Sequence, residues 1–184
     1  MAWLTPDAHA QAVEAARDIV LRRLDRSEVP RAALADLLER KEVDPRIAVE
    51  VLDRLEAAGV IDDAAYAARL TRTRFAEKGA ARRAIAEELR RKGLGEQDVA
   101  TALGQIDSDD EDSAALALAR KKLSATRHLP WEVRRRRTAA LLGRKGYSRE
   151  ATVRALEAAF AEESDWEAVL LPGPQGPEAF SPAH

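Results

Sequence analysis

Apolar residues recur every three or four positions along most of this chain, the spacing that predicts amphipathic helices. In one segment Ile47, Val51 and Leu55 fall on a single helical face, and Gly59 ends the pattern. Pairs such as Asp44-Pro45 supply a capping carboxylate and a first-turn proline. The pattern predicts nine helices: residues 5–26, 30–41, 44–59 and 62–79, one carrying Ile85 to Leu89, one carrying Val99 to Ile106, and three more up to residue 163.

An internal repeat groups these helices in threes. The segments LADLLERKEVDPRIAVEVLDRL from Leu34, IAEELRRKGLGEQDVATALGQI from Ile85 and TAALLGRKGYSREATVRALEAA from Thr138 align without gaps, at spacings of 51 and 53 residues. A fixed period of this size indicates stacked supersecondary units. We therefore predict an all-α fold of three tandem three-helix repeats that form an elongated, curved array.

The repeat also sets the expected domain boundaries. A first module spans residues 1–60, a second spans 61–107, and a third spans 108–163, preceded by an acidic linker or helix start at 107–112. Residues 164–184 are rich in proline and glycine and read as a disordered tail.

Positive charge is concentrated in the second and third modules, although the formal net charge is only −2. Residues 64–92 hold nine Lys and Arg against three acids, and residues 120–149 hold eleven against one, whereas residues 1–60 hold nine against twelve. Such local excess attracts an anionic partner. The candidate partner-binding residues are Arg69, Arg72, Lys78, Arg82, Arg83, Arg90, Arg91 and Lys92 in the second module, with Lys121, Lys122, Arg134, Arg137, Arg144 and Lys145 in the third. The candidate apolar anchors are Tyr66, Phe75, Trp131 and Tyr147, although an aromatic residue is more often part of the core, and Trp131 at a helix start is the one best placed for the surface.

The stretch between the first two modules carries two adjacent carboxylates. Gly59 ends one helix, Ile61 supplies a buried contact, and Asp62 and Asp63 open the next helix. These acids are better explained as helix caps than as a metal or acid-base site, because His9, His128 and His184 are scattered and cannot be assumed to converge with them. We interpret the stretch as a structural junction.

Several classes of chemistry find no support. The chain has no cysteine, no clustered histidines, no phosphate-binding glycine loop and no nucleophile motif. We therefore expect no catalytic site, no metal and no cofactor. No apolar run is long enough to cross a bilayer and the start lacks a signal peptide, so a monomeric cytoplasmic protein is expected.

Three stretches, in this order and spacing, resemble the RecX family of bacterial regulatory proteins. They are GVIDD at 59–63 with Tyr66, Lys78-Gly79 leading to LRRKGL at 89–94, and LLGRKGYS at 141–148. The resemblance covers about residues 14–160. One departure is Glu42, where the other two repeats have Gly93 and Gly146.

The resemblance implies a modular regulator that binds filaments of the RecA recombinase, inserts along their helical groove and limits recombinase and coprotease activity in DNA repair, recombination and the SOS response. Direct contact with single- or double-stranded DNA is left open. The alternative from the residues themselves is a sequence-tolerant DNA-binding or transcription regulatory protein, because each repeat has a helix, a turn and a second helix.

Overall fold

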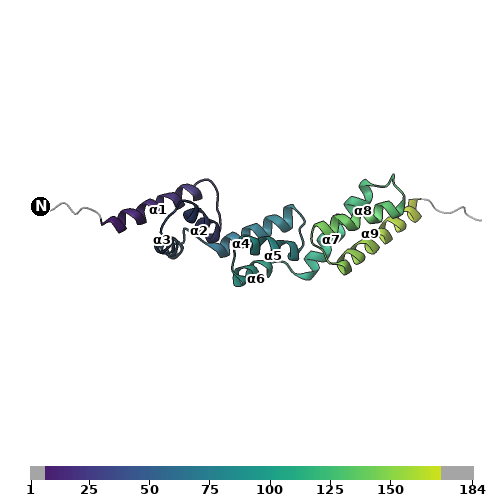
Figure 1. Cartoon of the computed structure of the whole chain (residues 1–184). Coiled ribbons are helices and arrows are strands. Elements are labelled where there is room, and N and C mark those ends of the chain that lie inside the picture. Colours follow the sequence, from purple (N-terminus) through teal and green to yellow (C-terminus); the bar gives the residue numbers. More distant parts are fainter. Residues whose placement is uncertain (1–6, 171–184) are drawn as a thin grey trace, which may run out of the picture. The chain divides into compact units, whose positions relative to one another are not determined.

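The structure, a computed structural model, describes residues 7–170, with side chains through residue 163. Within that range it contains nine α-helices, one short π-helix and no strand, which confirms the all-α prediction (Figure 1). In chain order the elements are α1 (Ala8–Leu24), α2 (Arg31–Arg40), α3 (Pro45–Ala57), α4 (Asp63–Arg72), η1 (Thr73–Glu77), α5 (Arg82–Arg91), α6 (Glu96–Leu103), α7 (Ser108–Ala125), α8 (Trp131–Arg144) and α9 (Arg149–Leu170).

Helices α1, α2 and α3 share one hydrophobic core, which we call the first module. Val20, Leu34 and Leu38 are fully buried there, and Val51 and Leu55 of α3 pack against them. The predicted face of α3 is thus the buried one. Burying each of these side chains contributes about 1.5–3 kcal/mol, so this core is the main source of the module's stability.

Helices α4, α5 and α6, together with η1, form the second module. Its core is built from Ala67, Ile85, Leu89 and Val99, with Tyr66 partly buried beside them. The first two modules belong to one compact unit, residues 1–107.

The third module comprises α7, α8 and α9 and lies in the other compact unit, residues 108–184. Helices α7 and α9 pack against each other, and the buried residues on both are mainly small. Ala115 and Ala119 of α7 are fully buried, and Ala155 and Ala159 of α9 are nearly so. Small side chains allow two helix backbones to approach closely.

The same turn ends the second helix of every module. Residues Glu42, Gly93 and Gly146 all have left-handed backbones, with φ of 58°, 81° and 92°. In each case the N–H of the following residue donates to the carbonyl of a leucine five residues earlier, which is the Schellman arrangement. The departure at Glu42 therefore leaves the turn geometry intact, although a side chain in this conformation costs about 1 kcal/mol.

Three predicted boundaries were wrong. Helix α1 begins at Ala8, and its cap is Asp7, whose Oδ1 accepts from the His9 N–H at 3.4 Å; the predicted cap, Thr5, lies outside the described residues. The helix expected to run from Asp62 to Gly79 changes to a π-helix at Thr73. Helix α9 continues to Leu170, past the end expected at residue 163. Of the two alternatives for the acidic block, a linker or a helix start, the structure has the start of α7. The rest of the expected tail, residues 171–184, lies outside the described residues.

Candidate functional site

Asp62 caps the helix that follows it. Its backbone is extended, and its Oδ1 accepts a hydrogen bond of 2.7 Å from the Ala65 N–H. This bond satisfies one of the donors that the first turn of α4 would otherwise leave unpaired. Ile61 beside it is 3% exposed and belongs to the core of the first module. The stretch thus ties the two modules together through packing as well as through the chain.

Asp63 caps a helix in the other module. Its Oδ1 accepts a hydrogen bond of 2.8 Å from the backbone N–H of Arg31, the first residue of α2. The residue before Arg31 is Pro30, whose side chain cannot serve as a cap. Burial raises the pKa of the Asp63 carboxyl more than this hydrogen bond lowers it, so the net shift is upward. The hydrogen bond favours the ionised carboxyl, but burial disfavours that form more strongly.

We expect Asp63→Asn to leave stability nearly unchanged and Asp63→Ala to lower the unfolding free energy by about 1 kcal/mol. Asparagine keeps an oxygen for the Arg31 N–H, whereas alanine removes the cap. Because burial raises the pKa of Asp63 in the folded protein, protonation of this carboxyl favours folding; that contribution is full below the ordinary pKa of aspartate and is lost as pH rises through the folded pKa. The capping bond itself remains at neutral pH, because the ionised carboxylate still accepts from the Arg31 N–H. Chemical denaturation at neutral pH tests this, and equal losses in both variants would contradict the capping role.

Two further contacts join the first and second modules. Arg69 of α4 forms an ion pair with Glu28, in the loop before α2. A Cβ built on Gly93 would lie 2.4 Å from the Cβ of Ala32, closer than two carbon atoms can approach. Gly93 is therefore required both for its left-handed turn and for the close contact between modules.

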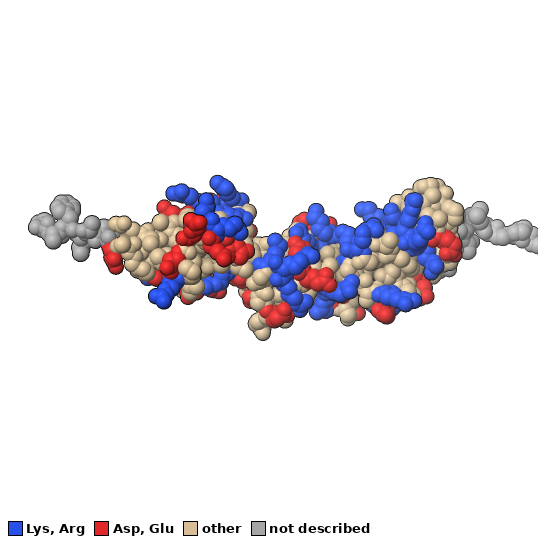
Figure 2. All heavy atoms as spheres, viewed as in Figure 1, with Lys and Arg blue, Asp and Glu red and all other residues tan. Residues whose placement is uncertain are grey.

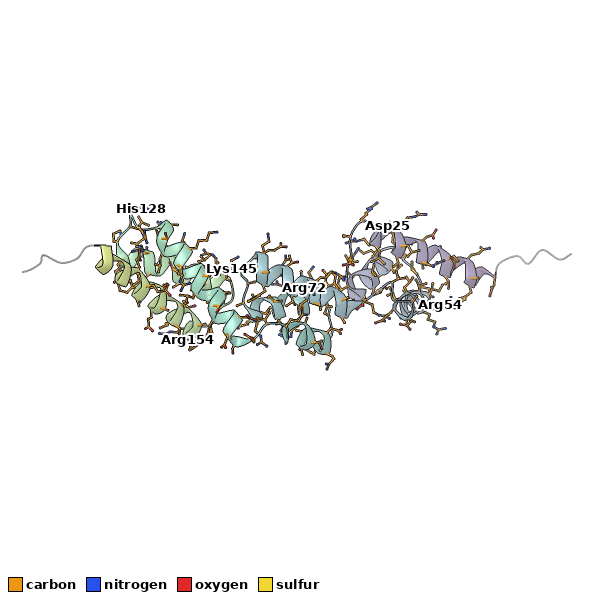
Figure 3. All side chains as sticks on the ribbon, turned by 180° about the vertical axis from the view of Figure 1, so that it is seen from behind. Asp25, Arg54, Arg72, His128, Lys145 and Arg154 are labelled. Atoms are coloured by element: carbon orange, nitrogen blue, oxygen red, sulfur yellow. The ribbon has the colours of Figure 1, made fainter. Side chains whose placement is uncertain are left out.

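The cations of the second module divide into paired and unpaired groups. Arg69 is engaged with Glu28, Arg90 forms two hydrogen bonds of 2.7 and 2.9 Å with Glu96, and Lys92 lies 5.9 Å from the centre of the Tyr66 ring. Lys78 is exposed and Arg82 is half-buried. Three exposed residues have no carboxylate partner among the described residues: Arg72, labelled in Figure 3, with Arg83 and Arg91.

Arg134 lies inside the third module and is not available to a partner. One of its guanidinium nitrogens, Nη2, donates to both carboxylate oxygens of Glu163, at 2.8 and 2.6 Å, and to the Leu123 carbonyl at 2.9 Å. Both charged side chains are only 11% exposed. Burial alone would raise the pKa of Glu163, but the hydrogen bonds from Arg134 and Arg127 outweigh it and hold that pKa below its usual range.

Arg134 is therefore removed from the candidate partner-binding residues, whereas Arg137 remains exposed. Arg137 and Arg144 are seven residues apart on α8, about two helical turns, and share an exposed face. Figure 2 shows Lys and Arg side chains gathered over α8 on the visible side of the third module. Lys145 is half-buried at the C-cap of α8. Several cations of this module have no carboxylate partner among the described residues: Lys121, half-buried Lys122, Arg137, Arg144 and two arginines outside the predicted candidate set, Arg136 and Arg149.

The candidate aromatic anchors have different environments. Tyr147 is 3% exposed, and burial raises the pKa of its hydroxyl to about 12, so it is a core residue and not a surface anchor. Tyr66 and Phe75 pack partly against the second core. Trp131 is half-exposed, and its ring lies 4.3 Å, centre to centre, from that of Phe160. Of the four candidate anchors, Trp131 is the one that lies on α8 with its candidate cations, and with Phe160 it forms a partly exposed aromatic pair.

The described residues hold no group of three or more His, Asp or Glu side chains placed to bind a metal ion. In the same part of the chain, none of the helices combines the length and apolar character that crossing a bilayer requires.

Comparisons with known proteins match this chain over most of its length. Two family models fit it: "RecX, second three-helix domain" over residues 62–103, and "RecX, third three-helix domain" over residues 109–156. A regulatory protein RecX from Streptomyces lividans is 41% identical over 153 residues, which is 83% of this chain and 81% of that protein. The counterpart from Thermobifida fusca is 43% identical over 133 residues, 72% of each chain.

Two solved structures share the arrangement of helices. A crystal structure of regulatory protein RecX matches with a TM-score of 0.68 at 27% identity, covering 78% of this chain and 71% of that one. RecX from Lactobacillus salivarius matches with a TM-score of 0.74, over 83% of this chain and 99% of that one. At 18% identity, the second likeness concerns the fold alone.

Proposed function

The chain belongs to the RecX family of regulatory proteins, and from this premise we propose that it binds filaments of the RecA recombinase and limits their recombinase and coprotease activities. It acts in the cytoplasm as a monomer that occupies the filament groove. A protein in the groove blocks extension of the filament and keeps out the substrates that the filament helps to cleave. The mechanism therefore requires no catalytic group in this chain.

The observation that supports this proposal best is that each of the two basic modules has exposed cations without a carboxylate partner among the described residues. In the second module these cations are Arg72, Arg83 and Arg91, and in the third they include Arg137 and Arg144. Surface cations that already pair with carboxylates on their own protein contribute little to a partner, because the pair must first be broken. These five are free to meet an anionic surface.

We expect the double reversal Arg137→Glu/Arg144→Glu to weaken binding to a DNA-assembled RecA filament about tenfold at moderate salt. The change removes two cations from one face of α8 and places two carboxylates there, without touching the Arg134–Glu163 pair. Sedimentation of the filament with bound protein measures the affinity, and filament ATP turnover measures inhibition.

The matched control is Arg17→Glu/Arg54→Glu, which changes the net charge equally. Both arginines lie in the first module and pair with carboxylates on their own helices, Glu14 and Glu50. The control should bind like the unaltered protein. Equal weakening by both variants would mean that only overall charge matters, and absence of filament binding by the unaltered protein would refute the proposed function.

The same measurements separate the rival function. A DNA-binding regulator would bind duplex DNA tightly without RecA, and the α8 reversal would remove that binding. The exposed cations alone fit both partners, since phosphate contacts are electrostatic and insensitive to sequence. We favour the RecA filament as the partner because the chain belongs to the RecX family. Tight DNA binding without RecA would reverse that preference.

A further inference from the structure

An apolar groove with a positively charged rim lies on the first module, the module whose sequence is mildly acidic. It encloses about 310 Å³ between α1 and α2. Its floor is formed by Ile19 and Leu37, both half-buried, and its rim by Arg22, Arg23, Arg26 and Lys41. No carboxylate lines it.

The rim cations are only partly neutralised by their neighbours. Arg22 lies 3.7 Å from Asp18, a loose surface pair. Arg23 donates to the hydroxyl and the carbonyl of Ser27, at 2.9 and 3.1 Å, which leaves its charge uncompensated. Within the described part of the chain, Arg26 and Lys41 have no carboxylate partner.

Helix stability accounts for only part of this arrangement. Cations in the last turn of a helix interact favourably with its dipole, which suits Arg22 and Arg23 at the end of α1. Arg26 lies beyond the last residue of that helix, Leu24, and Lys41 caps α2. The dipole also gives no reason for an open apolar floor between the cations.

We propose that this groove binds an acidic peptide segment in which an apolar side chain is flanked by carboxylates. Ile19 and Leu37 would contact the apolar side chain, and the rim cations would contact the carboxylates on either side. Charge complementarity of this kind gives specificity and raises the association rate. A nucleic acid fits the groove less well, because none of the six lining residues is aromatic and phosphates gain nothing from an apolar floor.

The groove stands apart from the surfaces assigned above. The two family models cover residues 62–103 and 109–156, so neither includes the first module. Figure 2 shows Lys and Arg side chains gathered at the end of α1, in the region of the rim. The proposal does not depend on binding to RecA and can hold if that function fails.

A labelled peptide of glutamates with two leucines one helical turn apart tests this proposal by fluorescence anisotropy with the full chain. We expect saturable binding that Arg22→Glu/Arg26→Glu weakens about tenfold. Both arginines are exposed, so the variant should keep its helical content by circular dichroism. A peptide with the leucines replaced by serines should also bind several-fold more weakly.

The control is again Arg17→Glu/Arg54→Glu, which should bind the peptide like the unaltered chain. Figure 3 places Asp25, next to the rim, and Arg54 at opposite edges of the first module. Three results would overturn the proposal: equal affinity for the serine peptide, equal weakening by the control, or tighter binding of a single-stranded oligonucleotide that depends on Arg22 and Arg26. Self-association abolished by the reversal would assign the groove to a second copy of the chain and would equally overturn it.

Discussion

Replacing Arg134 by alanine should lower the unfolding free energy of the third module by about 3 kcal/mol. Removing one partner of a buried ion pair typically costs about 3–5 kcal/mol, because the other charge stays in a poorly solvated place. Here Glu163 keeps its bond of 3.0 Å to Arg127, which favours the lower end of that range. The variant also loses the bond to the Leu123 carbonyl, which links α8 to α7.

Guanidinium denaturation followed by tryptophan fluorescence measures this loss, since Trp131 lies beside Arg134. Because the pKa of Glu163 is lowered in the folded protein, the stability from the pair is full above the ordinary pKa of glutamate and is lost as pH falls through the folded pKa. The difference between variant and parent should therefore shrink in acid. Arg137→Ala is the control and should change stability by less than about 0.5 kcal/mol, the usual range for an exposed site. An unchanged midpoint for Arg134→Ala would return that residue to the candidate binding surface.

Gly93→Ala should destabilise the compact unit formed by the first two modules by about 3 kcal/mol. Alanine at φ 81° carries about 1–2 kcal/mol of backbone strain. Its Cβ would also meet the Cβ of Ala32 at 2.4 Å, and forcing the two modules apart adds about 1–3 kcal/mol. Thermal unfolding followed by circular dichroism gives the total.

Gly59→Ala separates the two causes. Gly59 has a similar φ of 69°, but a Cβ there would meet nothing within 4 Å, so only the backbone strain of about 1–2 kcal/mol should appear. The rest of the destabilisation in Gly93→Ala comes from the contact with the Cβ of Ala32. Adding Ala32→Gly removes that Cβ, so a double-mutant cycle should show this part of the stability restored. If both glycine variants lose the same stability, the close contact between the modules contributes nothing.

Most of the fold could be predicted from the sequence because it depends on short-range patterns. Apolar periodicity placed the cores, as for Val51 and Leu55, and the repeat located equivalent turns. The α4 boundary was wrong because the change to a π-helix at Thr73 leaves no mark in the spacing of apolar residues. The cap at α1 was misplaced because Thr5 and Asp7 are both good caps, and the chain uses the second.

The candidate site was less predictable, because exposure depends on contacts between distant residues. Arg134 and Arg137 look alike in the sequence, yet one is held by Glu163, 29 residues away, and the other is exposed. The rim of the first-module groove was missed for a related reason. The net charge summed over residues 1–60 is negative, because acids on other faces outweigh the cations of the rim. The signal in the sequence was the group of three arginines at 22, 23 and 26.

The hydrogen bond from the Arg31 N–H to Asp63 also has a consequence for the order of synthesis. Helix α2 begins after a proline, and the carboxylate that caps it lies 32 residues further along the chain. When the nascent chain has exposed only its first three helices, the start of α2 still lacks its cap. The first module therefore reaches its full stability only after the beginning of the second has left the ribosome, which couples the two modules during translation as well as in the finished protein.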